Sequence, residues 1–90
     1  MILDLSEARE VLRLDSNDND VIIFSLLQAI PGYIEVTTGM TEVQQKQEPL
    51  AQTAAKFLLQ LWYNAEQTDS EKLQRTIDSL LKALTVKARG

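Results

Sequence analysis

Apolar residues recur every three to four positions through most of this chain, and no segment shows the alternation of apolar and polar residues that is typical of a strand. This spacing predicts an all-α fold. The 90 residues allow one domain, residues 1–90, with a single small core. Because the chain has no cysteine, disulfides cannot reinforce that core, and oligomerisation is the expected source of extra burial.

The first half of the chain predicts a short helix and a long one. The short helix covers residues 6–13, with Ser6 as its N-cap. After a polar connector, the long helix covers residues 19–38 and ends at Gly39. Pro31 lies inside it and removes one backbone donor, so we expect a kink or a break near residues 29–32. Its buried stripe is predicted to be Ile22, Leu26, Ala29, Ile30, Tyr33 and Ile34.

The second half predicts two more helices, which makes a small bundle of about four. An Ala-rich central helix covers residues 49–66 and has proline at its first position. A C-terminal helix covers residues 70–86. Residues 40–48 between the halves are polar and aperiodic, which predicts a long loop. The residues expected in the structural core are Leu12, Leu26, Ile30, Tyr33, Leu58, Leu61, Trp62, Ile77 and Leu81.

The composition argues against an enzyme. The chain lacks histidine as well as cysteine, so the usual general base and the commonest metal ligands are missing. The acidic connector after Leu14 fails the calcium-loop pattern, because Asp20 and Leu26 stand where that pattern requires glycine and glutamate. We therefore expect no catalytic residue, no cofactor and no metal site.

Charge is distributed unevenly along the chain. Residues 1–48 hold nine acids and three bases, whereas residues 49–90 hold four acids and six bases. Solvated helix faces explain this asymmetry, and so does complementarity between the acidic and basic ends of neighbouring copies. The first half has no cluster of basic residues, so tight nucleic-acid binding is not expected. Asp4 does not suit a signal peptide and the apolar run at residues 21–24 is too short to span a bilayer, which predicts a cytosolic protein without a membrane partner.

Two sequence blocks keep a fixed order that resembles the small helical head–tail connector (adaptor) proteins of tailed phages. The matching positions are Leu12-Arg13-Leu14-Asp15, Asp20, Tyr33-Ile34, Thr38-Gly39 and Trp62-Tyr63-Asn64. The chain departs from the family pattern at Ala65, where many relatives have arginine, and at Pro31, inside a helix that usually has no proline.

The resemblance implies a structural virion protein, made in the host cytoplasm and located at the head–tail junction. Such proteins assemble as a homo-oligomeric ring between the portal protein and the tail-completion or stopper protein, and DNA passes through the ring without being specifically bound. The expected subunit and partner interface is Met40, Val43, Tyr63, Asn64, Lys82, Lys87 and Arg89. Tyr63 is included because it lies about 100° round the helix from Trp62, and the tail beyond Leu84 is expected to be mobile until assembly.

Two alternatives stay open. One is a small helical regulatory or adaptor module that binds a single protein partner through a helix groove. The other, which the sequence favours least, is an acyl-carrier-like protein, because Asp78-Ser79-Leu80 matches the tripeptide that carries phosphopantetheine in that family. In carrier proteins that serine opens a helix near mid-chain, whereas Ser79 lies deep in the last predicted helix.

Overall fold

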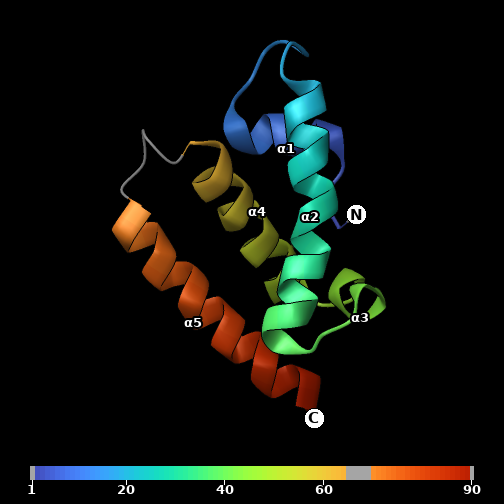
Figure 1. The fold of residues 1–90 in the computed structure, drawn as a ribbon, viewed down its shortest axis with the longest axis vertical. Helices are drawn as coiled ribbons and strands as arrows, with labels where there is room; N and C mark the ends of the chain where they lie inside the picture. Colours follow the sequence, from blue (N-terminus) through green and yellow to red (C-terminus); the bar gives the residue numbers. More distant parts are fainter. Residues whose placement is uncertain (1, 65–69, 90) are drawn as a thin grey trace.

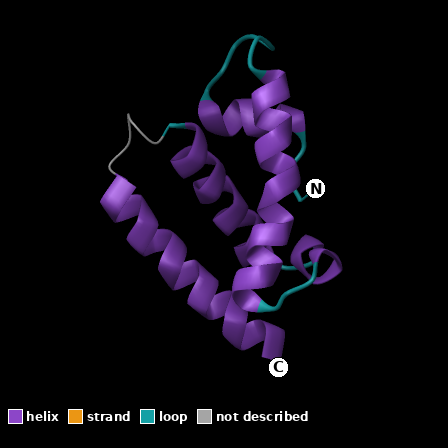
Figure 2. Cartoon of the chain, viewed as in Figure 1, coloured by secondary structure: helices purple, strands orange, loops and turns teal. Residues whose placement is uncertain are grey.

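Five α-helices form the part of the chain that this computed structural model describes, residues 2–64 and 70–89 (Figures 1 and 2). The helices are α1 (Leu5–Leu12), α2 (Asp20–Thr38), α3 (Glu42–Lys46), α4 (Pro49–Tyr63) and α5 (Ser70–Arg89). The all-α prediction is confirmed, and no strand occurs within the described residues. The helix that the sequence did not predict is α3, which lies in the segment expected to be a loop.

Asp4, and not Ser6, caps the first helix. The Asp4 carboxylate accepts a hydrogen bond from the backbone N–H of Glu7, and the Glu7 carboxylate accepts one from the backbone N–H of Asp4. This reciprocal capping box starts α1 one residue earlier than predicted. The helix ends at Arg13, whose left-handed backbone (φ 58°) turns the chain into the polar connector.

The second helix does not break at Pro31. It continues to Thr38 and ends at Gly39, whose φ of 84° lies in the left-handed region that favours glycine. Its buried side is rotated from the predicted stripe and consists of Ile23, Leu27, Ile30, Pro31, Ile34 and Thr38. Ile22 is 57% exposed. Both flanks of this helix are apolar, so periodicity alone does not fix which flank faces the core.

The short helix α3 is fastened to α2 by a buried glutamine. Thr41 caps α3 and forms a capping box with Gln44. The fully buried Gln45 side chain donates from Nε2 to the carbonyl oxygens of Pro31 (3.0 Å) and Met40 (2.8 Å). A helix of five residues has little stability of its own. These tertiary bonds explain why a segment without apolar periodicity is helical.

The central helix is α4, which contacts all four other helices. It begins with Pro49, as predicted, and buries Ala51, Ala54 and Ala55, whose small side chains let neighbouring helices approach closely. Leu59 is also fully buried, although it is not among the residues expected in the core. The predicted end of this helix at residue 66 lies outside the described residues.

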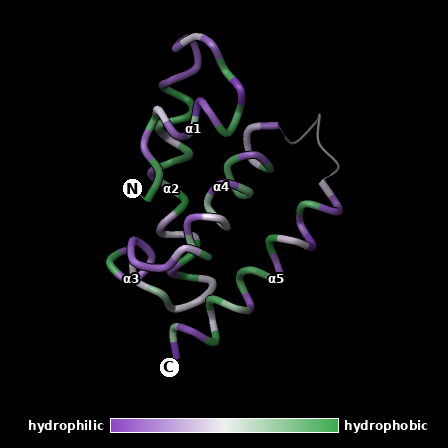
Figure 3. The backbone as a smooth tube through the Cα atoms, turned by 180° about the vertical axis from the view of Figure 1, so that it is seen from behind, coloured by the Kyte–Doolittle hydropathy of each residue, from purple (hydrophilic) through white to green (hydrophobic). Residues whose placement is uncertain are grey.

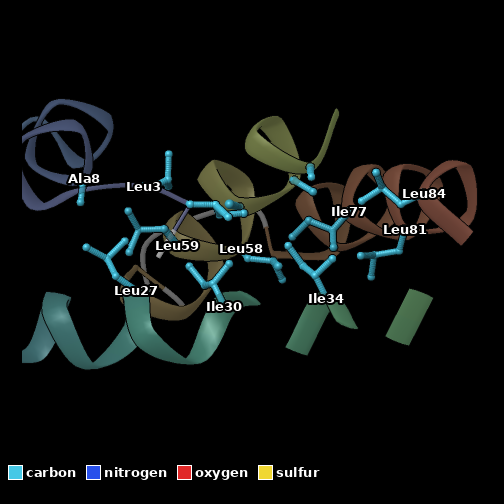
Figure 4. Close-up of a cluster of buried hydrophobic side chains, with 14 of the residues drawn as sticks. Leu3, Ala8, Leu27, Ile30, Ile34, Leu58, Leu59, Ile77, Leu81 and Leu84 are labelled. Atoms are coloured by element: carbon cyan, nitrogen blue, oxygen red, sulfur yellow. The ribbon is translucent and has the colours of Figure 1, made fainter. Parts of the chain in front are cut away.

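The last helix packs against α2 and α4 of its own domain. Hydrophilic and hydrophobic stretches follow one another along it with helical spacing, as expected for a helix that is apolar on one side (Figure 3). Ile77, Leu81 and Leu84 are buried, and Figure 4 shows them with Ile34 and Leu58 in one apolar cluster. The helix continues to Arg89, three residues beyond the predicted end, so the expected mobile tail is its last turn.

Most residues expected in the core lie in it or at its edge. Leu12, Ile30, Leu58, Ile77 and Leu81 are buried, whereas Leu26, Leu61 and Trp62 are partly buried and pack against the buried cluster. Tyr33 is a correction, because its side chain is 40% exposed. It covers Trp62 from outside: the two rings meet edge to face, with centroids 5.4 Å apart and planes at 86°.

Candidate functional site

Two of the residues predicted to lie at an interface make their contacts within the subunit itself. Met40 is only 4% exposed and belongs to the core cluster, so the prediction that it faces a partner is wrong. Lys87 forms an ion pair with Glu48 across α5 and the start of α4, with 3.2 Å between Nζ and Oε1. The Leu50 amide, and secondarily Lys87, hold the pKa of the Glu48 carboxyl below its ordinary value. Sequence patterns gave no signal for this pairing, because the two residues are far apart in the chain.

The Trp62-Tyr63-Asn64 block closes one end of the domain. The Tyr63 hydroxyl accepts a hydrogen bond of 2.6 Å from the Asn19 side-chain amide, which joins the end of α4 to the start of α2. Asn64 is the C-cap of α4, and its backbone N–H donates to the carbonyl of Gln60. Tyr63 and Asn64 are half-buried. Tyr63 therefore holds two helices together, and only its remaining exposed surface could meet another molecule.

The same end of the domain contains a two-point ion pair between α1 and α2. Arg9 donates from Nε to Oδ1 of Asp20 (3.0 Å) and from Nη2 to Oδ2 (2.8 Å). This bidentate geometry fixes both side chains. The hydrogen bond from Arg9 lowers the pKa of the Asp20 carboxyl from its ordinary value, and Asp20 raises the pKa of Arg9. Both side chains keep part of their surface in solvent, so the pair fixes the angle between helices more than it adds stability.

The other predicted interface residues are exposed but do not form one patch. Val43 is 69% exposed on α3. Lys82 and Arg89 are exposed on α5, and Arg89 is the last residue of that helix. In Figure 1, α3 and the C-terminal end of α5 lie toward the same end of the molecule, opposite the end that holds Tyr63. The predicted interface therefore divides into two separate regions.

The exposed apolar residues gather on α2, which the sequence interpretation placed largely in the core. Val21 and Val36 are 82% and 89% exposed, and Ile22 is 57% exposed. Asp20 and Glu35 are the only charged residues of this helix, and Asp20 is paired with Arg9. The apolar content of residues 21–36 beyond one helix face was the signal that could have identified this surface.

By length and composition α2 could cross a membrane, and it is the one such helix among the described residues. One third (33%) of its apolar window is buried against the rest of the domain. Core helices of soluble proteins meet the same criterion, so this property alone does not identify a membrane segment. Within residues 2–64 and 70–89, no three acidic side chains gather in an arrangement that could hold a metal ion.

Ser79, the residue on which the carrier interpretation depends, is exposed in the middle of α5. A phosphopantetheine-bearing serine at the start of a helix would have a different position in the fold. Comparisons with protein-family models, with curated proteins and with solved structures find no match to this chain. The function must therefore be argued from the residues and their arrangement.

Proposed function

We propose that this chain is a structural subunit of a phage head–tail connector, which assembles as a ring between the portal and the tail-completion or stopper protein. The observation that carries the proposal is the proximity of the two sequence blocks on which the resemblance depends. Tyr33 of the first block meets Trp62 of the second edge to face. Asn19, next to Asp20 of the first block, donates a hydrogen bond to Tyr63 of the second.

This proximity supports the proposal because it gives a physical reason for the order of the motifs. Leu12 and Ile34 are buried, Gly39 ends α2, and Asp20 joins α1 to α2. Asp20 lies at the joint between α1, α2 and α4, whereas Gly39 ends α2 at its other end beside α3, so the pattern marks both ends of the long helix. In such a role the subunit acts by geometry: one contact between different faces repeats from copy to copy until the ring closes.

Exposed and half-buried residues at the two ends of the domain are the proposed contacts for the ring and its neighbours. Val43 and Arg89 belong to one end, whereas Tyr63 and Asn64 belong to the other. DNA would pass through the ring without specific contacts, because the acidic half of the chain repels phosphates.

The test is assembly with a portal protein. Portal proteins of tailed phages would be purified, mixed with the chain and examined by electron microscopy and sedimentation. A ring of this chain seated on the portal is the expected result. Val43→Glu should weaken the complex, whereas Gln52→Glu on the exposed side of α4 should not. A chain that never binds the portal, but that captures one other protein partner, would replace the connector by the adaptor-module alternative.

A further inference from the structure

The charge of the domain is concentrated in two places. Residues 4–20, which form α1 and the connector after it, contain six acids and two bases, whereas α5 contains five bases and two acids. Residues 21–64 between them contain three acids and two bases, so the middle of the domain is nearly neutral. The uneven charge of the chain therefore belongs to two particular surfaces.

The first surface is a basic stripe on α5, formed by Arg75, Lys82 and Arg89. These residues are exposed and follow one another at seven-residue spacing, which places them along one side of the helix about 10 Å apart. Arg75 lies 3.5 Å from Glu71, but both side chains are mostly in solvent and the pair is weak. Lys82 and Arg89 form no ion pair with any described residue, and the chain has no acid after Asp78.

The second surface is an acidic end, formed by Glu10 of α1 with Asp15 and Asp18 of the connector. All three carboxylates are exposed, and none is paired with a base among the described residues. Of the two bases in this region, Arg9 already pairs with a carboxylate of its own subunit. Arg13 is the one remaining base, so an excess of negative charge faces solvent at this end.

A single subunit cannot bring the two surfaces together. The helix α1 contacts α2 and α4 but not α5, and α5 packs on α2 and α4. In Figure 1, α1 lies toward one end of the molecule and the C-terminal end of α5 toward the other. The opposite charges can therefore meet only between molecules.

We propose that the basic stripe of one copy docks on the acidic end of the next copy, head to tail. Every copy carries both surfaces, and their opposite charges attract and orient them. DNA fits the stripe less well, because its long run of phosphates would also meet the acidic end and a net charge of −4.

This contact joins two different patches, so it repeats from copy to copy and forms either a closed ring or an open filament. It deepens the proposed connector function, and its closure into a ring rests on that function. The docking itself does not, because it requires only the two charged surfaces.

The charge pairs are exposed, so the contact should be weak and sensitive to salt. Ion pairs at protein surfaces contribute little individually, and salt screens them over a distance of about 8 Å at physiological ionic strength. We expect association at high protein concentration in about 20 mM salt, and at least about tenfold weaker association in about 0.5 M salt.

Sedimentation across a concentration series tests the basic stripe with two matched lysines. Lys82→Glu should weaken association about tenfold, because it places a carboxylate opposite the acidic end. Lys56→Glu, at an exposed lysine of α4, makes the same change in net charge outside the proposed contact and should leave association nearly unchanged. Species larger than a dimer should form in the natural chain, because a head-to-tail contact leaves one free surface at each end.

Charge reversal tests whether the acidic end is the occupant of the stripe. Glu10→Lys with Asp15→Lys should weaken association as Lys82→Glu with Arg89→Glu does. All four substitutions in one chain should restore most of it, since the two surfaces have exchanged signs and the net charge is again −4. The melting temperature of each variant shows whether the monomer is folded.

Several results would overturn the proposal. These are a chain that stays monomeric at millimolar concentration in low salt, equal effects of Lys82→Glu and Lys56→Glu, association that stops at a dimer, or four substitutions that restore nothing. Binding of duplex DNA that Lys82→Glu abolishes would assign the stripe to phosphates instead.

The connector function is judged separately on the portal. Rings that form there equally well with Lys82→Glu and Arg89→Glu would leave the connector proposal standing and remove this contact from the ring. Association that follows the charges, from a chain that never binds a portal, would leave only the head-to-tail docking.

Discussion

At the scale of single residues, the two described glycines are expected to respond oppositely to the same substitution. Gly32→Ala should stabilise the dilute monomer by up to about 1 kcal/mol, because the added methyl meets open space and alanine favours a helix. Gly39→Ala should destabilise it by about 1 kcal/mol or more, because φ is +84° there. Thermal unfolding at low protein concentration measures both. If Gly32→Ala also lowers the melting temperature, the space beside Gly32 is not free within the monomer.

Relative to the size of its side chain, Gln45 is the residue whose substitution should lower the stability of the domain most. It is fully buried and supplies the donors for two backbone carbonyls, those of Pro31 and Met40. Gln45→Ala should cost about 2–4 kcal/mol, because it leaves a cavity and removes both hydrogen bonds. Gln45→Met keeps the volume and should cost less than Gln45→Ala, because it removes both hydrogen bonds but also removes the buried Oε1, which accepts no hydrogen bond within the domain. Denaturant unfolding is the measurement, and the exposed Gln47→Ala, expected within about 0.5 kcal/mol of the natural chain, is the control. Equal effects at 45 and 47 would show that α3 is not held through Gln45.

At the scale of the helices, the ion pair between α1 and α2 should make stability depend on acid pH. The pKa of Asp20 is lowered in the folded state, so its contribution is present above the unfolded pKa of about 3.9 and is lost as the pH falls through the lower folded value. Glu48 acts in the same direction. Asp20→Asn should therefore be less stable than the natural chain at pH 7, and the difference should shrink below about pH 4. Denaturant unfolding at several pH values measures this, with the exposed Asp18→Asn as control. A difference that does not change with pH would exclude Asp20 as its source.

The sequence predicted which long segments are helical. It did not predict how α2 is rotated about its axis, or that α3 is a helix. Apolar spacing, Pro49 and Gly39 located the long elements, because these signals are local. The rotation of α2 about its axis was misjudged because Ile22 and Ile23 are equally apolar, and only packing decides that Ile23 is the buried one. The helix α3 depends on bonds from Gln45 to a distant carbonyl, which no local pattern records.

At the scale of the whole molecule, the candidate site was less predictable than the fold. Exposure had to be inferred from residue type, and three residues show why this fails. Met40 follows a helix stop but folds back into the core, while Lys87 and Tyr63 find partners that are distant in sequence, Glu48 and Asn19. Conversely, the valines on the outer face of α2 were not considered for an interface, because apolar residues in a periodic segment are usually assigned to the core.

The C-terminal turn of α5 can be used to test which contacts hold this helix against the rest of the domain. Lys87 joins α5 to Glu48 at the start of α4, and Ala88 packs against the core. Deleting the residues after Thr85 should therefore lower the melting temperature by about 4–8 °C, the shift that accompanies roughly 1 kcal/mol in a domain this small. Lys87→Ala alone should have a smaller effect that high salt removes, since the Lys87 side chain is half exposed. Arg89→Ala keeps the helix length and should change little. An unchanged melting temperature after the deletion would mean that α5 is held by Ile77, Leu81 and Leu84 alone, and that its last turn is free to meet a partner.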